Sequence, residues 1–179
     1  NFIRICNAKK EWTPQRMFEE TRETLRANIK GRVGILLASG GVDSTVLAEL
    51  AKQEFPKERL HMFHVDTGFE RKGEPEEVWN VLTGKKYLNE ILSSDVPQEI
   101  EHELLERWRG KSFANVHLIR AGKRFRSALE SIADPEQKRK IIGELFIQIV
   151  NEEIKNIGLD IDQCVLLQGT IYPDVIESQ

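Results

Sequence analysis

The segment best suited to chemistry lies where a short apolar run gives way to a helical pattern. The run spans residues 33–38, and the segment that follows reads Ser39-Gly40-Gly41-Val42-Asp43-Ser44-Thr45. Adjacent glycines allow backbone conformations that are closed to other residues, and they let an anion approach the main chain closely. The first amides of a helix have no partner within the helix, and the helix dipole favours negative charge beside them. The segment, with its three hydroxyl side chains, therefore predicts a phosphate-binding loop.

The spacing of this loop differs from two common nucleotide-binding patterns. The GxxxxGK[ST] pattern with its lysine is absent, and so is the GxGxxG pattern. A purely structural alternative is a glycine-rich turn in which Asp43 or Ser44 only caps the following helix. Six consecutive residues suited to phosphate, at the junction of a strand and a helix, favour the phosphate-binding loop over that alternative.

The elements around the loop alternate between strands and helices. Short apolar runs predict strands at residues 33–38, 60–66, 115–119 and 164–167. Helical patterns begin at Pro14 after the N-cap Thr13, follow the loop until Pro56, and span about 75–83, 97–109 and 135–156. This alternation predicts an α/β fold: a Rossmann-like, open, twisted parallel sheet with helices on both faces. Ligands of such sheets collect outside the carboxyl ends of the strands, where the loop is expected.

Composition excludes several classes of protein. The chain has 179 residues, 40% of them hydrophobic, and a formal net charge of −3, which favours one packed domain over disorder. No apolar run is long enough to span a membrane, and 26 basic against 29 acidic residues give no overall attraction to nucleic acid. Cys6 and Cys164 lack metal-ligand spacing. The first residues lack a signal peptide and a starting Met, so we expect a cytoplasmic protein and a piece of something longer.

The loop closely resembles the SGGxDS pyrophosphate loop of the N-type ATP pyrophosphatases. Three further stretches resemble one family within them, the GMP synthetases, in the same order along the chain. Residues 65–72 look like VD(N/T)GxxRK, residues 133–143 are similar to DPEQKRKIIG, and residues 168–178 look like QGTxYPDVIES. The resemblance covers nearly the whole chain except about 79–113, and it implies an adenine nucleotide alpha hydrolase-like fold.

Two of these motifs can also be interpreted from their residues alone, without the resemblance. Asp66 and Thr67 end the second strand, so we expect them to line the same crevice as the loop. Arg71 and Lys72 follow at once, and they either meet phosphate charge or begin a solvated helix. Asp134 before Pro135 suits an N-cap, a role that does not exclude a catalytic one.

Four charged residues leave alternatives open. Lys138 and Arg139 reach a polyphosphate if their helical turn faces the crevice, and they are surface charge if it faces water. Asp174 and Glu177 are three residues apart and share one face of a helix if Pro173 begins one. Such a pair could hold Mg²⁺, or Asp174 could cap the helix.

The resemblance implies an enzyme, a ligase that amidates XMP to GMP in purine biosynthesis. Its cofactors are ATP and Mg²⁺, and an adenylyl-XMP intermediate forms before ammonia displaces AMP. The implied catalytic residues are Asp43, Asp134, Lys138 and Arg139. The implied ATP and pyrophosphate contacts are Ser39, Gly40, Gly41, Val42, Asp43, Ser44, Thr45, Val65 and Asp66. Arg71, Asp174 and Glu177 are placed on the substrate side, and Asp43 beside Mg²⁺.

The resemblance also implies a division of the chain and its partners. Residues 1–30 are expected to be a linker and lead helix from a glutaminase domain or subunit, which supplies ammonia. Residues 31–179 are expected to form the ATP pyrophosphatase domain, with an acidic helical insertion at about 79–113. The dimerisation domain that normally follows the last motif, and makes the full-length enzyme a homodimer, is expected to be absent here.

Two alternative functions accompany this prediction. One is a nucleotide-binding module that binds ATP without turnover, because the partner domain for XMP is missing. The other is a tRNA-thiolating ATP pyrophosphatase, which would need a catalytic cysteine near the nucleotide or a basic RNA-binding face. Cys164 precedes a buried-looking strand and the chain is acidic overall, so the sequence disfavours the second alternative.

Overall fold

The fold is built on a sheet of four parallel strands, as the alternation of strands and helices predicts. The computed structural model describes residues 5–6, 13–84 and 115–169. Its strands are β1 (Val33–Leu37), β2 (Leu60–Asp66), β3 (Val116–Arg120) and β4 (Cys164–Leu167), in the spatial order β3-β2-β1-β4. Each strand pairs in parallel with its neighbours, so the α/β prediction is confirmed. The helix expected at 97–109, together with Asp174 and Glu177, lies outside the described residues.

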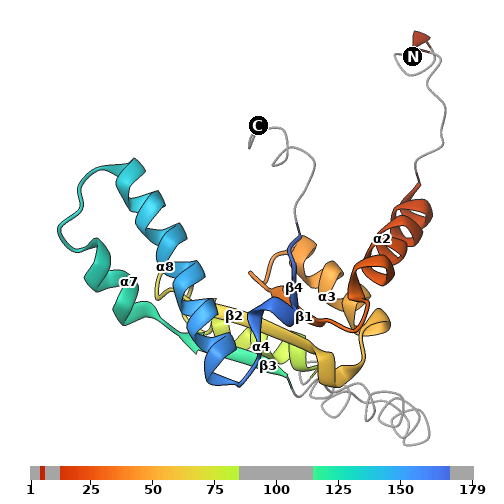
Figure 1. Ribbon diagram of the computed structural model, residues 1–179. Coiled ribbons are helices and arrows are strands. Elements are labelled where there is room, and N and C mark those ends of the chain that lie inside the picture. Colours follow the sequence, from red (N-terminus) through yellow and green to blue (C-terminus); the bar gives the residue numbers. More distant parts are fainter. Residues whose placement is uncertain (1–4, 7–12, 85–114, 170–179) are drawn as a thin grey trace, which may run out of the picture.

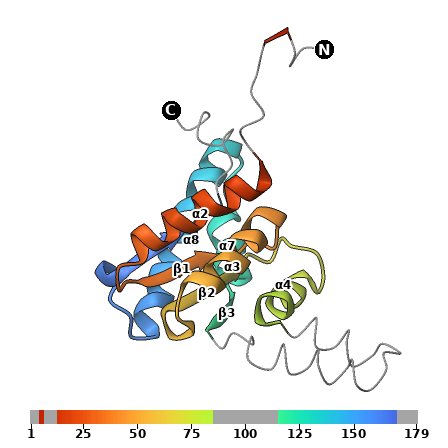
Figure 2. The same cartoon turned by 90° about the vertical axis from the view of Figure 1, so that its right-hand side faces the viewer.

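Helices connect the strands and cover the sheet (Figures 1 and 2). They are α2 (Pro14–Ile29), α3 (Val42–Glu54), α4 (Glu74–Thr83), α7 (Gly122–Leu129) and α8 (Pro135–Asn156), with short 3-10 turns at Lys57–Arg59 and Ile161–Gln163. The caps predicted for two of them are present. Thr13 Oγ1 accepts a hydrogen bond from Arg16 N at the start of α2, and Asp134 Oδ2 accepts from Gln137 N at the start of α8.

Two apolar clusters, one on each face, hold the helices on the sheet. Successive residues of a strand point to opposite faces, and Leu36 and Ile35 of β1 accordingly belong to different clusters. One cluster joins the sheet to α2, α3 and α4 through buried residues such as Leu25, Ala48 and Val78. The other joins it to α7 and α8 through Phe125, Ile149, Val150 and Ile154. In Figure 2, α3 and α4 lie on one side of the sheet and α8 lies on the other.

The strand order places a topological switch point at the end of β1. The chain proceeds from β1 to β2 and then β3 on one side, whereas β4 pairs with the opposite edge of β1. Leu37 at the end of β1 is in register with Phe63, and Leu36 is in register with Leu167. Where the connections after two neighbouring strands run to opposite sides of the sheet, a crevice opens at the carboxyl ends of those strands. Ligands of α/β proteins bind in this crevice. The glycine-rich segment that follows β1 lies at this crevice.

Helix α7 is an element that the sequence patterns did not predict. It is eight residues long, has no side-chain cap at its amino end, and carries three basic residues. Its apolar side is therefore short, and Phe125 is its buried anchor.

Cys6 is exposed and Cys164 is half-buried. None of the helices within the described parts of the chain is both long and apolar enough to cross a membrane.

Candidate active site

The glycine-rich segment forms a tight turn between β1 and α3. The strand ladder continues for one residue beyond β1, because Ala38 N donates to Phe63 O over 2.9 Å. Gly40 then takes a φ of 83°, a left-handed conformation that favours glycine. Gly41 is the N-cap of α3 and supplies no side-chain hydrogen bond to it. The turn therefore leaves the amino end of α3 without a side-chain cap, as an anion-binding helix end requires.

Hydroxyl groups brace this turn from within. Ser39 Oγ lies 3.2 Å from Ser44 Oγ and accepts a hydrogen bond from Gly41 N. Ser44 Oγ and Thr45 Oγ1 both donate to Gly41 O, over 3.0 and 2.9 Å. Ser44 is buried, whereas Ser39, Gly40, Gly41 and the next two residues are exposed. Ser44 and Thr45 thus fix the shape of the turn, and its exposed tip is the part open to a ligand.

The end of β4 packs against the first turn of α3. A Cβ atom added to Gly169 would lie 3.2 Å from the carbonyl carbon of Asp43 and 3.3 Å from Ser44 N. Only glycine allows the two backbones to come so close without displacement. This contact brings the start of the motif at 168–178 to the phosphate-binding loop, from the opposite side of the switch point.

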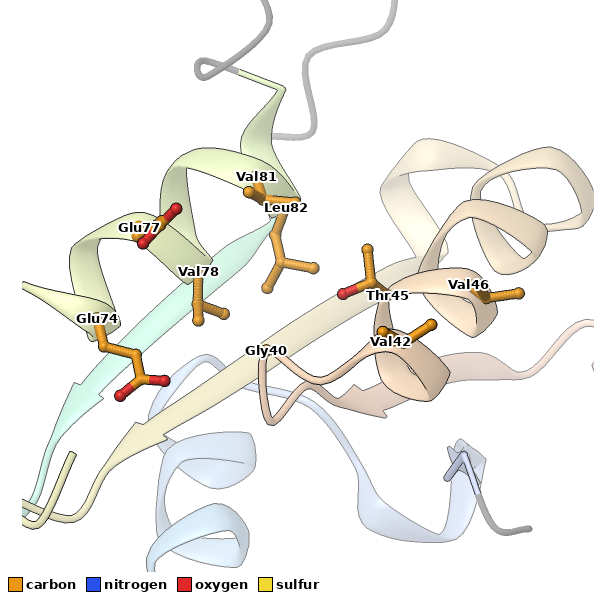
Figure 3. Close-up of a pocket in the computed structure, with 9 residues that line it drawn as sticks. All are labelled: Gly40, Val42, Thr45, Val46, Glu74, Glu77, Val78, Val81 and Leu82. Carbon is orange, nitrogen blue, oxygen red and sulfur yellow. The ribbon is translucent and has the colours of Figure 1, made fainter. Parts of the chain in front are cut away.

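One pocket lies between the loop and helix α4 (Figure 3). Its volume is about 430 Å³, and Gly40, Val42, Thr45 and Val46 line one wall. The wall from α4 consists of Glu74, Glu77, Val78, Val81 and Leu82. In Figure 3 the side chains of Val78 and Leu82 point from α4 toward the loop and α3 across the pocket. Its lining is largely apolar, with two carboxylates from α4.

A second pocket lies at the carboxyl ends of β1 and β2. Its volume is about 260 Å³, and its lining consists of Leu37, Ala38, Ser39, His64, Val65, Thr67, Glu70 and Phe146. Ser39 of the loop, Val65 of β2 and Thr67 thus meet at one cavity, as the sequence predicts for Thr67. Phe146 comes from α8, far along the chain, and no sequence pattern pointed to it. Apolar walls with a few polar groups are typical of pockets that bind small molecules.

Asp66 and Arg71 shape the segment after β2. Asp66 Oδ1 accepts from Gly68 N over 2.8 Å, and its other oxygen lies 3.7 Å from an Arg120 guanidinium nitrogen. Asp66 thus closes its own turn and faces a cation from β3. Arg71 is exposed, and its backbone N donates to Glu74 Oε2 at the start of α4. Its side chain lies at the surface just before that helix.

Three of the four expected catalytic residues lie on a separate part of the molecule. Asp134 caps α8, Arg139 pairs with Glu136 in the same turn, and Lys138 is half-buried. The amino end of α8 (cyan in Figure 1) stands apart from α3, beyond the end of the sheet. The structure does not bring these residues together with the glycine-rich loop.

The side chains near Asp43 determine how the expected Mg²⁺ could be bound. Among residues 13–84 and 115–169, no group of three or more Asp, Glu, His or Cys side chains is arranged for a metal ion. Asp43 is exposed in the first turn of α3, next to the open end of the loop. Mg²⁺ is commonly held by one or two carboxylates together with substrate phosphates. A carboxylate at the open end of a phosphate-binding loop fits that mode, in which phosphate supplies further ligands.

The fold and this site define a class of protein. A parallel sheet with an open, glycine-rich helix start at its switch point is a nucleotide-binding α/β fold of the adenine nucleotide alpha hydrolase type. Residues 21–116 match the asparagine synthase family, more than half of the chain. The chain belongs to this family of N-type ATP pyrophosphatases.

Curated relatives extend the similarity along nearly the whole chain. A Plasmodium falciparum protein named GMP synthase [glutamine-hydrolyzing] is 37% identical over 175 residues, which are 98% of this chain and 27% of that protein. Proteins of the same name from Synechococcus sp. and Porphyromonas gingivalis are 38% and 39% identical, over 99% of this chain and 28% and 29% of theirs. The resemblance seen in the motifs is confirmed, and the chain spans under a third of the length of these relatives.

Proposed function

We propose that this chain is the ATP pyrophosphatase part of a ligase that amidates XMP to GMP with the use of ATP. The observation that carries the proposal is the open amino end of α3, which follows two glycines at the switch point of the sheet. The names of the relatives support GMP as the product and glutamine as the nitrogen source, because each is named GMP synthase [glutamine-hydrolyzing]. XMP as the substrate is what the resemblance of the motifs implies.

The proposed reaction has two displacements. The 2-oxygen of XMP attacks the α-phosphorus of ATP, the bond to the bridging β-oxygen breaks, and pyrophosphate leaves. Ammonia then attacks the purine carbon that carries the adenylyl group, and AMP departs with the former 2-oxygen while a proton is released. Negative charge grows on the departing pyrophosphate, so fixed positive dipoles at that point accelerate the first step.

In this proposal the loop supplies those dipoles. The exposed tip at Ser39, Gly40 and Gly41, with the first amides of α3, binds the β- and γ-phosphates. Asp43 would hold Mg²⁺, which neutralises phosphate charge when it is bound. We also propose ATP contacts at Val42, Ser44, Thr45 and Asp66. The main contribution of Ser44 and Thr45 is to shape the turn through their hydrogen bonds to Gly41 O.

The pocket at the ends of β1 and β2 is the proposed site of the adenine base. It adjoins the loop through Ser39, and Val65 and Phe146 offer it apolar surfaces. We place Arg71, Asp174 and Glu177 on the XMP side, and Asp134, Lys138 and Arg139 at the adenylation step. The last three require the amino end of α8 to approach the loop when substrates bind, because it stands apart from α3 in Figure 1.

The proposed partners follow from the names of the relatives. A glutaminase domain or subunit would supply ammonia, because those names include the hydrolysis of glutamine. A cytoplasmic homodimer as the whole enzyme is what the resemblance of the motifs implies. Residues 1–30 would lead in from that domain and residues 31–179 would form the ATP pyrophosphatase domain, with the insertion at about 79–113.

The experiment is an assay of pyrophosphate release that needs no glutaminase. The protein is incubated with ATP, Mg²⁺, XMP and ammonium, and each component is omitted in turn, with IMP replacing XMP as a matched control. Release that depends on XMP, together with GMP formation, would support the proposal. Binding of ATP without any release would favour a nucleotide-binding module, and absence of ATP binding would overturn the proposal.

A further inference from the structure

His64 is a buried polar residue on the otherwise apolar strand β2. It is 2% exposed, and its Nδ1 donates to Ala38 O over 2.8 Å. Ala38 follows β1 directly and precedes Ser39, the first residue of the phosphate-binding loop. The N–H of Ala38 donates to Phe63 O in the strand ladder. The hydrogen bond from His64 satisfies the carbonyl oxygen of the same residue, Ala38. His64 thus fixes the peptide from which the loop departs.

The other ring nitrogen of His64 reaches the segment after β2. Nε2 lies 3.0 Å from Glu70 Oε2, and the His64 side chain is 3% exposed against 23% for Glu70. The second oxygen of Glu70 accepts a longer hydrogen bond from Thr67 N, over 3.4 Å. One imidazole therefore connects the chain leaving β1 to the chain leaving β2, across the pocket that Ser39, Thr67 and Glu70 line.

The burial of the ring gives this connection its strength. A backbone carbonyl only accepts, so Nδ1 donates to Ala38 O, while Nε2 lies within hydrogen-bond distance of the Glu70 carboxyl group. Hydrogen bonds are stronger in a buried environment, where the loss of a partner also costs more. Within the described parts of the chain, no buried side-chain nitrogen or oxygen lacks a partner, so the link is complete as it stands.

We propose that His64 and Glu70 are a positioning pair, which holds the phosphate-binding loop in its binding-competent shape and thereby sets the affinity for ATP. Both residues also line the pocket proposed for adenine, so the positioning role is tested by the conformation of the loop without any nucleotide. The part that concerns ATP rests on the proposed function, whereas the part that concerns the loop can be measured without any ligand.

The test compares four variants by amide hydrogen exchange in the protein without ATP. Glu70→Ala removes the carboxylate from a partly exposed site, so the fold is expected to survive. Glu70→Gln keeps a side chain of the same length that can hydrogen-bond to His64 Nε2. Glu58→Ala is the matched control, because it removes an exposed carboxylate from the 3-10 turn just before β2. Thermal unfolding of each variant shows whether it is folded.

Exchange in a peptide covering residues 38–45 is expected to be about fivefold faster in Glu70→Ala, as for the loss of one hydrogen bond. Glu70→Gln is expected to stay within about twofold of the parent, and Glu58→Ala to match it. His64→Phe, which removes both links, is expected to exceed Glu70→Ala. Equal exchange in Glu70→Ala and Glu58→Ala would overturn the positioning role.

Calorimetric titration with ATP then separates this proposal from the proposed function. The dissociation constant is expected to rise about fivefold in Glu70→Ala, because binding must first restore the loop. A parent protein that shows the exchange difference but does not bind ATP would refute the nucleotide site and leave the loop positioning established. Faster exchange with an unchanged dissociation constant would refute the link between the pair and ATP affinity.

Discussion

Gly40 lies directly beneath Val78, so the phosphate-binding loop and helix α4 meet where a side chain has no room. A Cβ atom at Gly40 would come within 2.4 Å of Val78 Cγ2, and the φ of Gly40 is 83°. Two separate costs therefore oppose any larger residue. One is the steric conflict with Val78, and the other is the left-handed backbone, which costs an L-residue about 1–2 kcal/mol.

We predict that Gly40→Ala weakens ATP binding at least tenfold and lowers the free energy of unfolding. Combining it with Val78→Ala should relieve the steric conflict but leave the backbone cost of about 1–2 kcal/mol. The measurements are calorimetric titration with ATP and urea unfolding of both variants and of Val78→Ala alone. Full recovery in the double variant would show that the backbone conformation of Gly40 is of no consequence.

Two other glycines should respond in opposite directions to the same substitution. A Cβ at Gly122, the first residue of α7, would lie 2.9 Å from the Cα of Gly68, whereas one at Gly143 would meet nothing within 4 Å. Gly122→Ala should therefore destabilise by about 1–3 kcal/mol, because the backbones must separate. Gly143→Ala, inside α8, should stabilise by about 0.5–1 kcal/mol, because alanine favours the helix. Urea midpoints would contradict this account if both variants shifted in the same direction.

The paired histidines of β2 and β3 predict a loss of stability in mild acid. His61 Nδ1 lies 3.0 Å from His117 Nε2, and the two rings stack. Burial lowers the pKa of both, and the neighbouring charge of His117 lowers that of His61 further, although Glu153 partly opposes the shift at His117.

Because their pKa values are lower in the folded state, the unfolded chain binds more protons at these two sites. The stability they contribute is therefore present above about pH 6.5, and it is lost as the pH falls through the folded pKa values. Urea unfolding between pH 8 and 5 should show this decline. The double variant His61→Gln with His117→Gln should flatten it over that range, and an unchanged slope would exclude the pair as its cause.

The sheet and the loop could be predicted because their signals are local. Each strand is a short apolar run, and the glycines stand where β1 gives way to α3. Caps such as Thr13 and Asp134 are also local, since each needs only the amide three residues later. Helix α7 is too short and too basic for a pattern to emerge, although Phe125 anchors it.

Contacts across the sheet could not be predicted in this way. The link from His64 to Ala38 and Glu70 depends on the register of β1 with β2 and on one ring orientation. Phe146 reaches the pocket beside Val65 only because α8 packs over the sheet at that point. A polar histidine within an apolar strand was the one available signal, and it indicated neither partner.

Asp43 offers the sharpest test of the chemistry, since its carboxylate is exposed and its removal leaves the packing intact. Asp43→Asn should change the free energy of unfolding by no more than about 1 kcal/mol, the typical effect of a charge at a helix amino end. It should lower XMP-dependent pyrophosphate release at least about a hundredfold, because phosphate charge would lose the metal ligand proposed to balance it. Glu49→Gln, which neutralises another exposed carboxylate on α3, is the matched control and should keep the parent rate. A higher Mg²⁺ requirement in Asp43→Asn but not in Glu49→Gln would tie the loss to the metal, whereas undiminished release in Asp43→Asn would remove Asp43 from the active site.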